Sequence, residues 1–186
     1  MHGYRSSYYS DFGVSLDYYK SLGFNILLVD QRAHDKSDGR YITYGILEKF
    51  DCKSWINKGI ELFGPDVDIV ICGISMGAST VLMSAGLQLP ENVKAIIADC
   101  GFTSPYEIVK LTTKKVNKHI PSFVVDIINF FCRVLAGFDL KEDNTMSALQ
   151  KTNIPVIFIH GTRDDFVPPE MTMRNFETCT SEKELL

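Results

Sequence analysis

A serine between two glycines is the strongest candidate for chemistry in this chain. Residues 73–77 read Gly-Ile-Ser-Met-Gly and follow a short apolar run at residues 67–72. A serine on the turn from a strand into a helix has its hydroxyl raised above the sheet, where it can attack a carbonyl carbon. Side chains at Gly73 and Gly77 would crowd such a turn. The pattern therefore predicts Ser75 as a nucleophile.

Two backbone N–H groups are needed beside such a serine, because they stabilise the negative oxygen that forms when the carbonyl becomes tetrahedral. One is expected from Met76, at the start of a helix whose dipole favours developing negative charge. The other is expected from Tyr4, in the segment His2-Gly3-Tyr4. His2 itself is interpreted as a structural residue.

A carboxylate that orients a histidine base completes this kind of site. Asp164 lies just beyond an apolar run at residues 155–160 and is the predicted acid. Asp99, at the end of another apolar run, is the less favoured candidate. A plain loop role for Asp164 is the remaining alternative.

The histidine base is the part that the sequence does not supply. No histidine follows Asp164, and the histidines other than His2 are His34, His119 and His160. We interpret these three as surface or packing residues. A serine hydroxyl without a base in reach is a poor nucleophile, and loss of one triad member costs on the order of 10⁴–10⁶ in turnover.

The apolar pattern predicts the scaffold that positions these residues. Strands alternating with helices imply a mainly parallel sheet with helices on both faces, and reactive groups gather where its strands end. Buried strands are predicted at residues 25–30, 67–72, 93–99 and 155–160, a further strand begins near residue 183, and helices are predicted at residues 8–22, 46–63 and 76–87.

Residues 103–143 interrupt this alternation. They contain no strand pattern and read as two or three amphipathic helical pieces broken at Pro121 and Gly137. An insertion of this length after a strand end is predicted to lie over the site as a lid, with a helical hairpin packed on the sheet edge as the alternative. The chain then divides into a core of residues 1–102 and 144–186 and a helical lid insertion.

Composition restricts the classes of function. The chain has 186 residues, a net charge of −4 and 45% hydrophobic residues, which fits one globular domain. The cluster of Lys114, Lys115 and Lys118 is too small to indicate nucleic-acid binding. We expect no metal, cofactor or membrane span. Five irregularly spaced cysteines and no signal peptide predict a reducing, cytoplasmic location.

In this order the motifs resemble the α/β-hydrolase family, and more narrowly its bacterial serine hydrolases of the esterase and aminopeptidase-like branch. The likeness includes residues 30–37, similar to the family's DxRxxGxS turn, and residues 98–105, similar to the loop that opens its lid. Asp35 stands at the glycine position of that turn, and aspartate tolerates positive φ better than most residues. The resemblance implies a three-layer fold with a mainly parallel sheet and helices on both faces.

The resemblance also implies roles for four residues: Ser75 as nucleophile, Asp164 as acid, and Tyr4 with Met76 as the oxyanion hole. The family has strands before its HG motif and a histidine after its acid. Here only Met1 precedes that motif, and the chain ends 22 residues beyond Asp164 (186 minus 164). We therefore expect a fragment of a longer hydrolase, incomplete at both ends.

The expected activity is hydrolysis of a carboxylic ester, thioester or small amide of a small-molecule acyl substrate, through an acyl-Ser75 intermediate. The alternative is a catalytically silent protein that retains only the pocket. A dehalogenase on this scaffold is disfavoured, because it needs a carboxylate at the position of Ser75. The sequence defines neither the substrate nor the oligomeric state. Phe123, Phe130 and Phe131 are interpreted as core residues, with an acyl-pocket lining as the alternative.

Overall fold

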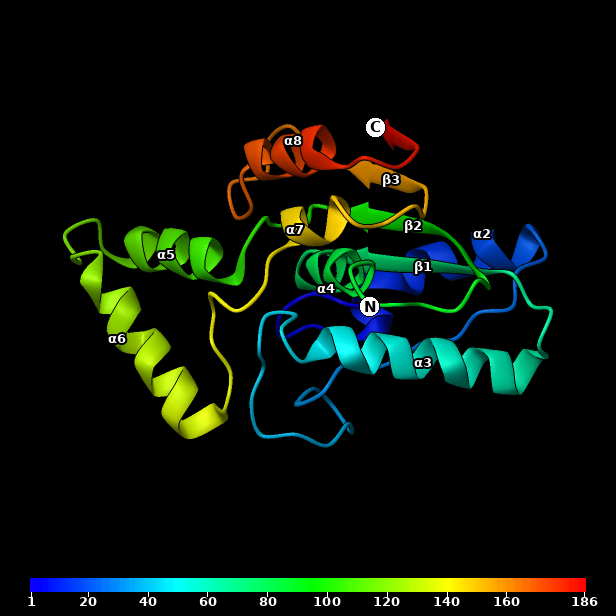
Figure 1. Ribbon diagram of the computed structural model, residues 1–186, viewed down its shortest axis with the longest axis horizontal. Coiled ribbons are helices and arrows are strands. Elements are labelled where there is room, and N and C mark those ends of the chain that lie inside the picture. Colours follow the sequence, from blue (N-terminus) through cyan, green and yellow to red (C-terminus); the bar gives the residue numbers. More distant parts are fainter.

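A computed structural model describes residues 1–186 and contains one four-stranded sheet. The strands are β1 (Ile69–Ile74), β2 (Val93–Asp99), β3 (Val156–Ile159) and β4 (Lys183–Leu185), and they lie in that order. Every neighbouring pair is parallel. All four strands therefore end at the same edge of the sheet, on the left in Figure 1.

Helices connect the strands and cover the sheet. They are α1 (Tyr8–Phe12), the short 3-10 helix η1 (Gly13–Ser15), α2 (Leu16–Ser21), α3 (Glu48–Phe63), α4 (Met76–Ser84), α7 (Thr145–Leu149) and α8 (Pro169–Thr178). In Figure 1, α4 lies in front of β1 and β2, and α2 lies behind β1. Helices thus flank a parallel sheet, which confirms the predicted fold class.

The main core lies between α4 and the sheet. Side chains of a strand alternate between its two faces, and those directed at α4 are the buried ones. They include Ile71, Ile96 and Phe158, which are at most 8% exposed, and they pack against Val81 and Leu82 of α4. Each such side chain contributes roughly 1.5–3 kcal/mol through burial. This packing fixes the end of β1 against the start of α4.

Three of the four predicted strands are confirmed, and the strand expected near residue 183 is β4. The strand predicted at residues 25–30 is wrong. The backbone groups of residues 25–29 make no hydrogen bond to a neighbouring strand, and the adjacent side of β1 bonds instead to Met1. Ile74 N–H donates to the carbonyl oxygen of Met1 over 3.1 Å. An apolar run predicts burial, whereas a strand also requires a partner for its backbone.

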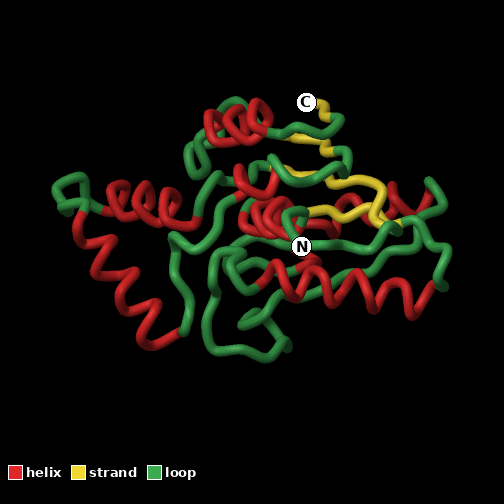
Figure 2. Tube along the Cα trace, in the orientation of Figure 1, coloured by secondary structure: helices red, strands yellow, loops and turns green.

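Three helical pieces occupy residues 103–143, as predicted: α5 (Pro105–Val116), α6 (Phe123–Phe131) and the π-helical turn η2 (Cys132–Ala136). Figures 1 and 2 show them beyond the edge where the strands end. The interpretation of three α6 phenylalanines as core is wrong. Phe123, Phe130 and Phe131 are 61%, 58% and 52% exposed, because α6 packs inward through its opposite side, at Val125 and Asn129.

A buried carboxylate fixes the loop before α3. Glu48 is fully buried and accepts hydrogen bonds from Thr43 N–H (2.7 Å) and Gly45 N–H (2.8 Å). The hydroxyl of Thr43 also donates to it. These bonds flank Tyr44, whose φ of 56° lies in the left-handed region. The carboxylate thereby holds Tyr44 in a conformation that a tyrosine rarely adopts.

We expect Glu48→Ala to lower the free energy of unfolding by roughly 2–4 kcal/mol, because it leaves buried N–H groups without an acceptor. Urea denaturation monitored by circular dichroism measures this loss. Glu61→Ala is the matched control on the same helix, since the Glu61 side chain is 67% exposed. Its effect should stay within about 0.5 kcal/mol. Equal losses in the two variants would contradict the role given to Glu48.

Candidate active site

Ser75 lies on the sharp turn between β1 and α4. Its φ of 54° and ψ of −117° are unusual for a non-glycine residue, and such strain costs roughly 1–3 kcal/mol. Ser75 N–H donates to the carbonyl oxygen of Asp99 over 2.8 Å, and Ser79 N–H donates to the Ser75 carbonyl over 3.1 Å. The backbone of this strained residue is therefore fixed by both β2 and α4.

The two glycines of the motif permit close backbone packing around Ser75. A Cβ atom at Gly73 would lie 2.3 Å from the carbonyl oxygen of Gly77. A Cβ atom at Gly77 would lie 2.0 Å from the carbonyl oxygen of Met1. Real Cβ atoms do not approach backbone so closely, so both positions require glycine. The structure thus confirms the predicted need for glycine at both positions.

Two backbone N–H groups close to Ser75 have no partner within the chain. Tyr4 and Met76 line the same cavity as Ser75, and neither N–H donates a hydrogen bond. Gly3, the residue before Tyr4, lies close to Ser75, because a Cβ atom built at Gly3 would be 3.4 Å from the Ser75 Cβ. The neighbouring N–H of Gly3 is occupied by Asp11 over 2.6 Å. Tyr4 and Met76 therefore offer unoccupied donors that face the same cavity as Ser75.

The cavity at Ser75 has a volume of about 230 Å³ and mostly apolar walls. Two of its residues, Ile108 and Thr112, belong to α5, and Phe166 comes from the loop after Asp164. The remaining lining residues are Tyr4, Tyr44, Ser75, Met76 and Phe102. A cavity of this size and polarity suits a short acyl or aryl group. We refer to it below as the apolar cavity.

Asp164 lies in the loop after β3, at the same edge of the sheet. One of its carboxylate oxygens, Oδ1, accepts from Phe166 N–H (2.7 Å) and Val167 N–H (3.0 Å), which fixes its orientation. The other, Oδ2, lies 3.5 Å from His160 Nε2. Asp164 does not line the apolar cavity itself, but its loop supplies Phe166 to the wall.

Cys100 directly follows β2, the strand that lies between β1 and β3. Burial, together with the charge of Asp99 and a smaller effect of Asp164, raises the pKa of the Cys100 thiol to about 12. A hydrogen bond to the backbone of Ser75 acts in the opposite direction on the same pKa. Backbone hydrogen bonds join the ends of the three strands, since Ser75 N–H donates to the carbonyl oxygen of Asp99 and Cys100 N–H donates to that of Ile159, each over 2.8 Å. The turns that carry Ser75 and Asp164 therefore leave the same edge of the sheet.

None of the four histidines lines the apolar cavity. His2, His34 and His160 are buried or nearly so, and both ring nitrogens of each have partners. The ring of His2 bonds to the carbonyl oxygen of Gly3 and the N–H of Gln31. The ring of His34 bonds to the carbonyl oxygen of Arg32 and the N–H of Arg5. The ring of His160 bonds to the hydroxyl of Thr172 and the carbonyl oxygen of Val167. His119 is exposed in the turn after α5. The structure thus places no imidazole of this chain as a base for Ser75.

Asp99, the less favoured acid, gives a pH-dependent prediction. Burial raises the pKa of its carboxyl, the charge of His160 partly opposes this effect, and the charge of Asp164 adds to it. The pKa of the Asp99 carboxyl is higher in the folded protein than the value of 3.8 expected in the unfolded chain. Its contribution to stability is therefore fully present below pH 3.8 and is lost as the pH rises through the folded-state pKa. The ionised form at neutral pH is therefore the unfavourable one.

We accordingly expect Asp99→Asn to raise the melting temperature at about pH 7, with a gain that shrinks as the pH falls toward about 4. Thermal unfolding followed by circular dichroism at several pH values tests this. Asp66→Asn is the control, because Asp66 is exposed. A gain for Asp99→Asn that stayed constant with pH would show that ionisation of Asp99 is not its cause.

A parallel sheet flanked by helices, with a serine on the tight turn between a strand and a helix, defines an α/β-hydrolase. The model of the family described as serine hydrolase (FSH1) matches residues 51–186, and the chain belongs to this family. This match agrees with the resemblance inferred from the motifs.

Curated relatives extend the likeness over most of the chain. The chain is 32% identical over 169 residues to the uncharacterized protein YqkD of Bacillus subtilis, a match that covers 88% of the chain and 54% of that protein. It is 23% identical over 167 residues to protein bem46 of Schizosaccharomyces pombe, covering 89% and 50%. The chain thus spans about half the length of the curated relatives it matches.

Solved structures of esterases and lipases share the fold. The Pyrococcus furiosus esterase Pf2001 matches with a TM-score of 0.73 at 22% identity, covering 100% of this chain and 70% of that one. The monoacylglycerol lipase of Paleococcus ferrophilus matches with a TM-score of 0.71 at 19% identity, covering 100% and 82%. At these identities the likeness establishes the fold alone.

Every helix of the structure is too short or too polar to cross a bilayer. No group of three or more histidine, cysteine, aspartate or glutamate side chains is arranged to hold a metal ion. All five cysteines are free thiols.

Proposed function

We propose that the chain carries the acyl-transfer site of a serine hydrolase that cleaves a small carboxylic ester, thioester or amide through an acyl-Ser75 intermediate. One observation carries the proposal. Ser75 lies on a strained turn at an apolar cavity, beside two N–H groups without partners. Membership of a serine hydrolase family supports an enzyme over a silent pocket.

In the proposed reaction, Ser75 Oγ attacks the substrate carbonyl carbon and the leaving group departs. The N–H groups of Tyr4 and Met76 donate to the oxygen that becomes negative in the tetrahedral state. Asp164 is proposed to orient an imidazole that accepts the Ser75 proton. Because no histidine of these 186 residues lines the cavity, we propose that full turnover needs an imidazole from outside them.

Residues 103–143 are proposed to act as a lid over the core of residues 1–102 and 144–186. Ile108 and Thr112 of α5 already form part of the cavity wall, which supports this role. The substrate is proposed to be a small molecule rather than nucleic acid. Five free thiols support action in a reducing compartment such as the cytoplasm.

An acylation experiment with p-nitrophenyl butyrate tests the proposed function. The p-nitrophenolate group leaves without needing a proton, so Ser75 should be acylated slowly even without a base in the cavity. The butyryl ester should then persist, because its hydrolysis needs a base to activate water. We expect release of about one equivalent of p-nitrophenolate per chain and a mass gain of one butyryl group on the peptide that contains Ser75. A butyryl group on a different residue, or no covalent adduct, would overturn the proposal.

A further inference from the structure

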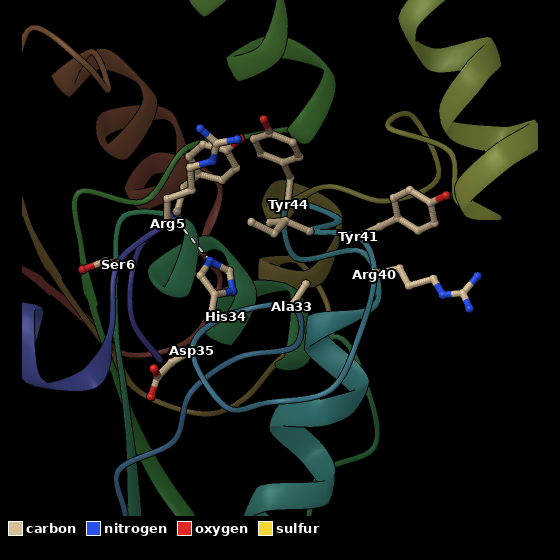
Figure 3. A pocket seen from close by; sticks show the side chains of 10 residues that line it. Arg5, Ser6, Ala33, His34, Asp35, Arg40, Tyr41 and Tyr44 are labelled. Carbon is tan, nitrogen blue, oxygen red and sulfur yellow. Dashed lines mark hydrogen bonds between the residues drawn. The ribbon is translucent and has the colours of Figure 1, made fainter.

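A second cavity, of about 500 Å³, shares Tyr4 and Tyr44 with the apolar cavity. Its other side chains are largely polar, and they include Arg5, His34, Asp35 and Arg40 (Figure 3). We call this cavity the polar groove. Since Tyr4 and Tyr44 belong to both cavities, a ligand bound at Ser75 can extend past these two rings into the polar groove.

The polar groove carries a net positive charge. Arg5 and Arg40 have no carboxylate within ion-pair distance, whereas Arg32, Arg133 and Arg174 pair with Asp51, Asp139 and Glu107. Asp35 is the one carboxylate of the groove, and in Figure 3 it projects from the side of His34 opposite Arg5. Two arginines against one aspartate leave one uncompensated positive charge.

His34 adds no charge to the groove, and it holds the backbone of Arg5. Its Nδ1 lies 2.8 Å from the carbonyl oxygen of Arg32, to which it donates, so Nε2 is free to accept from Arg5 N–H over 3.0 Å. This pattern requires the neutral imidazole. The dashed line in Figure 3 marks the bond to Arg5.

Arg5 is held in an unusual conformation at the junction of the two cavities. Its φ of 54° lies in the left-handed region, which persists only where surrounding bonds impose it. The Arg5 guanidinium carbon lies 5.5 Å from the centre of the Tyr4 ring, and that ring stacks on Tyr44 at 5.3 Å. The buried Glu48 in turn fixes the loop of Tyr44. The backbone of Arg5 is therefore fixed beside the aromatic pair, and its exposed guanidinium lies next to the Tyr4 ring with its donors unpaired.

We propose that the polar groove binds a carboxylate on the alcohol part of the substrate, with Arg5 as its main partner and Arg40 as a second cation farther along the groove. This inference rests on the proposed function. The acyl part would occupy the apolar cavity, where a charge would be poorly solvated. A guanidinium matches a carboxylate with two parallel hydrogen bonds, which makes it a selective partner for this group.

Binding of a stable substrate analogue tests the inference without requiring turnover. The probes are para-acetamidobenzoate and its uncharged methyl ester, titrated against the chain by calorimetry. We expect the carboxylate to bind roughly tenfold more tightly than the ester, since hydrogen bonds to charged groups are worth more than neutral ones. Arg5→Gln should remove most of this preference and Arg40→Gln a smaller part. Arg133→Gln, an exposed arginine outside the groove, should leave it unchanged.

Equal affinities for acid and ester would overturn the inference, as would a preference that persists in the Arg5→Gln/Arg40→Gln double variant. A second pair of probes, succinic acid monoanilide and its methyl ester, places the carboxylate on the acyl part. A stronger preference for the acid in this pair would overturn the assignment of the groove to the alcohol part.

The outcomes for the groove and for Ser75 are separable. If p-nitrophenyl butyrate acylates Ser75 but no carboxylate preference exists, the groove inference alone is wrong. If the carboxylate preference exists and depends on Arg5 but Ser75 is never acylated, the proposed function is wrong and the groove remains an anion site.

Discussion

Replacing Ser75 by alanine is expected to abolish covalent capture of a fluorophosphonate by this chain. The reagent requires a nucleophilic oxygen at the end of β1, next to donors that stabilise the phosphonyl oxygen. We expect the labelling rate to fall at least about a hundredfold, since loss of the nucleophile in such sites removes nearly all of their reactivity. Intact-protein mass spectrometry over time measures the rate.

Ser54→Ala is the matched control for this substitution. Ser54 is an exposed serine on α3 and does not line the apolar cavity. Its replacement should leave the labelling rate unchanged. Circular dichroism establishes that both variants are folded. Labelling that continued at the original rate in folded Ser75→Ala would show that another residue is the nucleophile.

Gly77→Ala is expected to produce the largest loss of stability among single methyl additions to the serine turn. The added Cβ would lie 2.0 Å from the carbonyl oxygen of Met1 and 2.6 Å from that of His2. Both contacts are with backbone, so relief requires α4 to move away from the segment that carries Tyr4. We expect the free energy of unfolding to fall by about 3 kcal/mol or more, at the upper end of the cost of overpacking.

Gly161→Ala serves as the comparison for Gly77→Ala. No atom lies within 4 Å of a Cβ built at Gly161, and its φ is not positive. This alanine should be neutral or slightly stabilising, within about 1 kcal/mol. Urea denaturation of both variants measures the difference. A Gly77→Ala protein as stable as the Gly161→Ala protein would contradict the close packing described at the turn.

The serine turn could be predicted from the sequence because its determinants are local. Five consecutive residues set the glycine requirements, and the apolar run before them sets the strand. The same holds for Asp35, where positive φ was expected from a turn motif and is observed at 42°. Local sequence also predicted the helical pieces of residues 103–143 and the break at Gly137, whose φ is 72°.

Features that depend on distant segments were not predictable in the same way. The apolar pattern at residues 25–30 could not reveal that the backbone of β1 forms hydrogen bonds with Met1 and not with these residues. The amphipathic pattern of α6 could not show which of its faces meets the core. The cavity residues Tyr44 and Ile108 were also missed, since they reach Ser75 only through tertiary packing. The adjacent glycine in Tyr44-Gly45 was the one local signal of an unusual backbone.

Arg5 illustrates how the sequence and the structure complement each other. It directly follows Tyr4, a predicted donor, yet nothing in its neighbours indicates that a histidine 29 residues away fixes its backbone. The structure shows this contact and the stacked tyrosines beside the guanidinium. The substrate preference that we infer therefore depends on contacts between segments and could not be read from the motif alone.

A crystal structure of the chain after reaction with a short alkyl fluorophosphonate would show whether Ser75 is the nucleophile of this site. We expect a bond between phosphorus and Ser75 Oγ, the alkyl group in the apolar cavity, and the phosphonyl oxygen within hydrogen-bonding distance of both Tyr4 N and Met76 N. An adduct on another residue, or a phosphonyl oxygen directed away from these two N–H groups, would contradict this expectation.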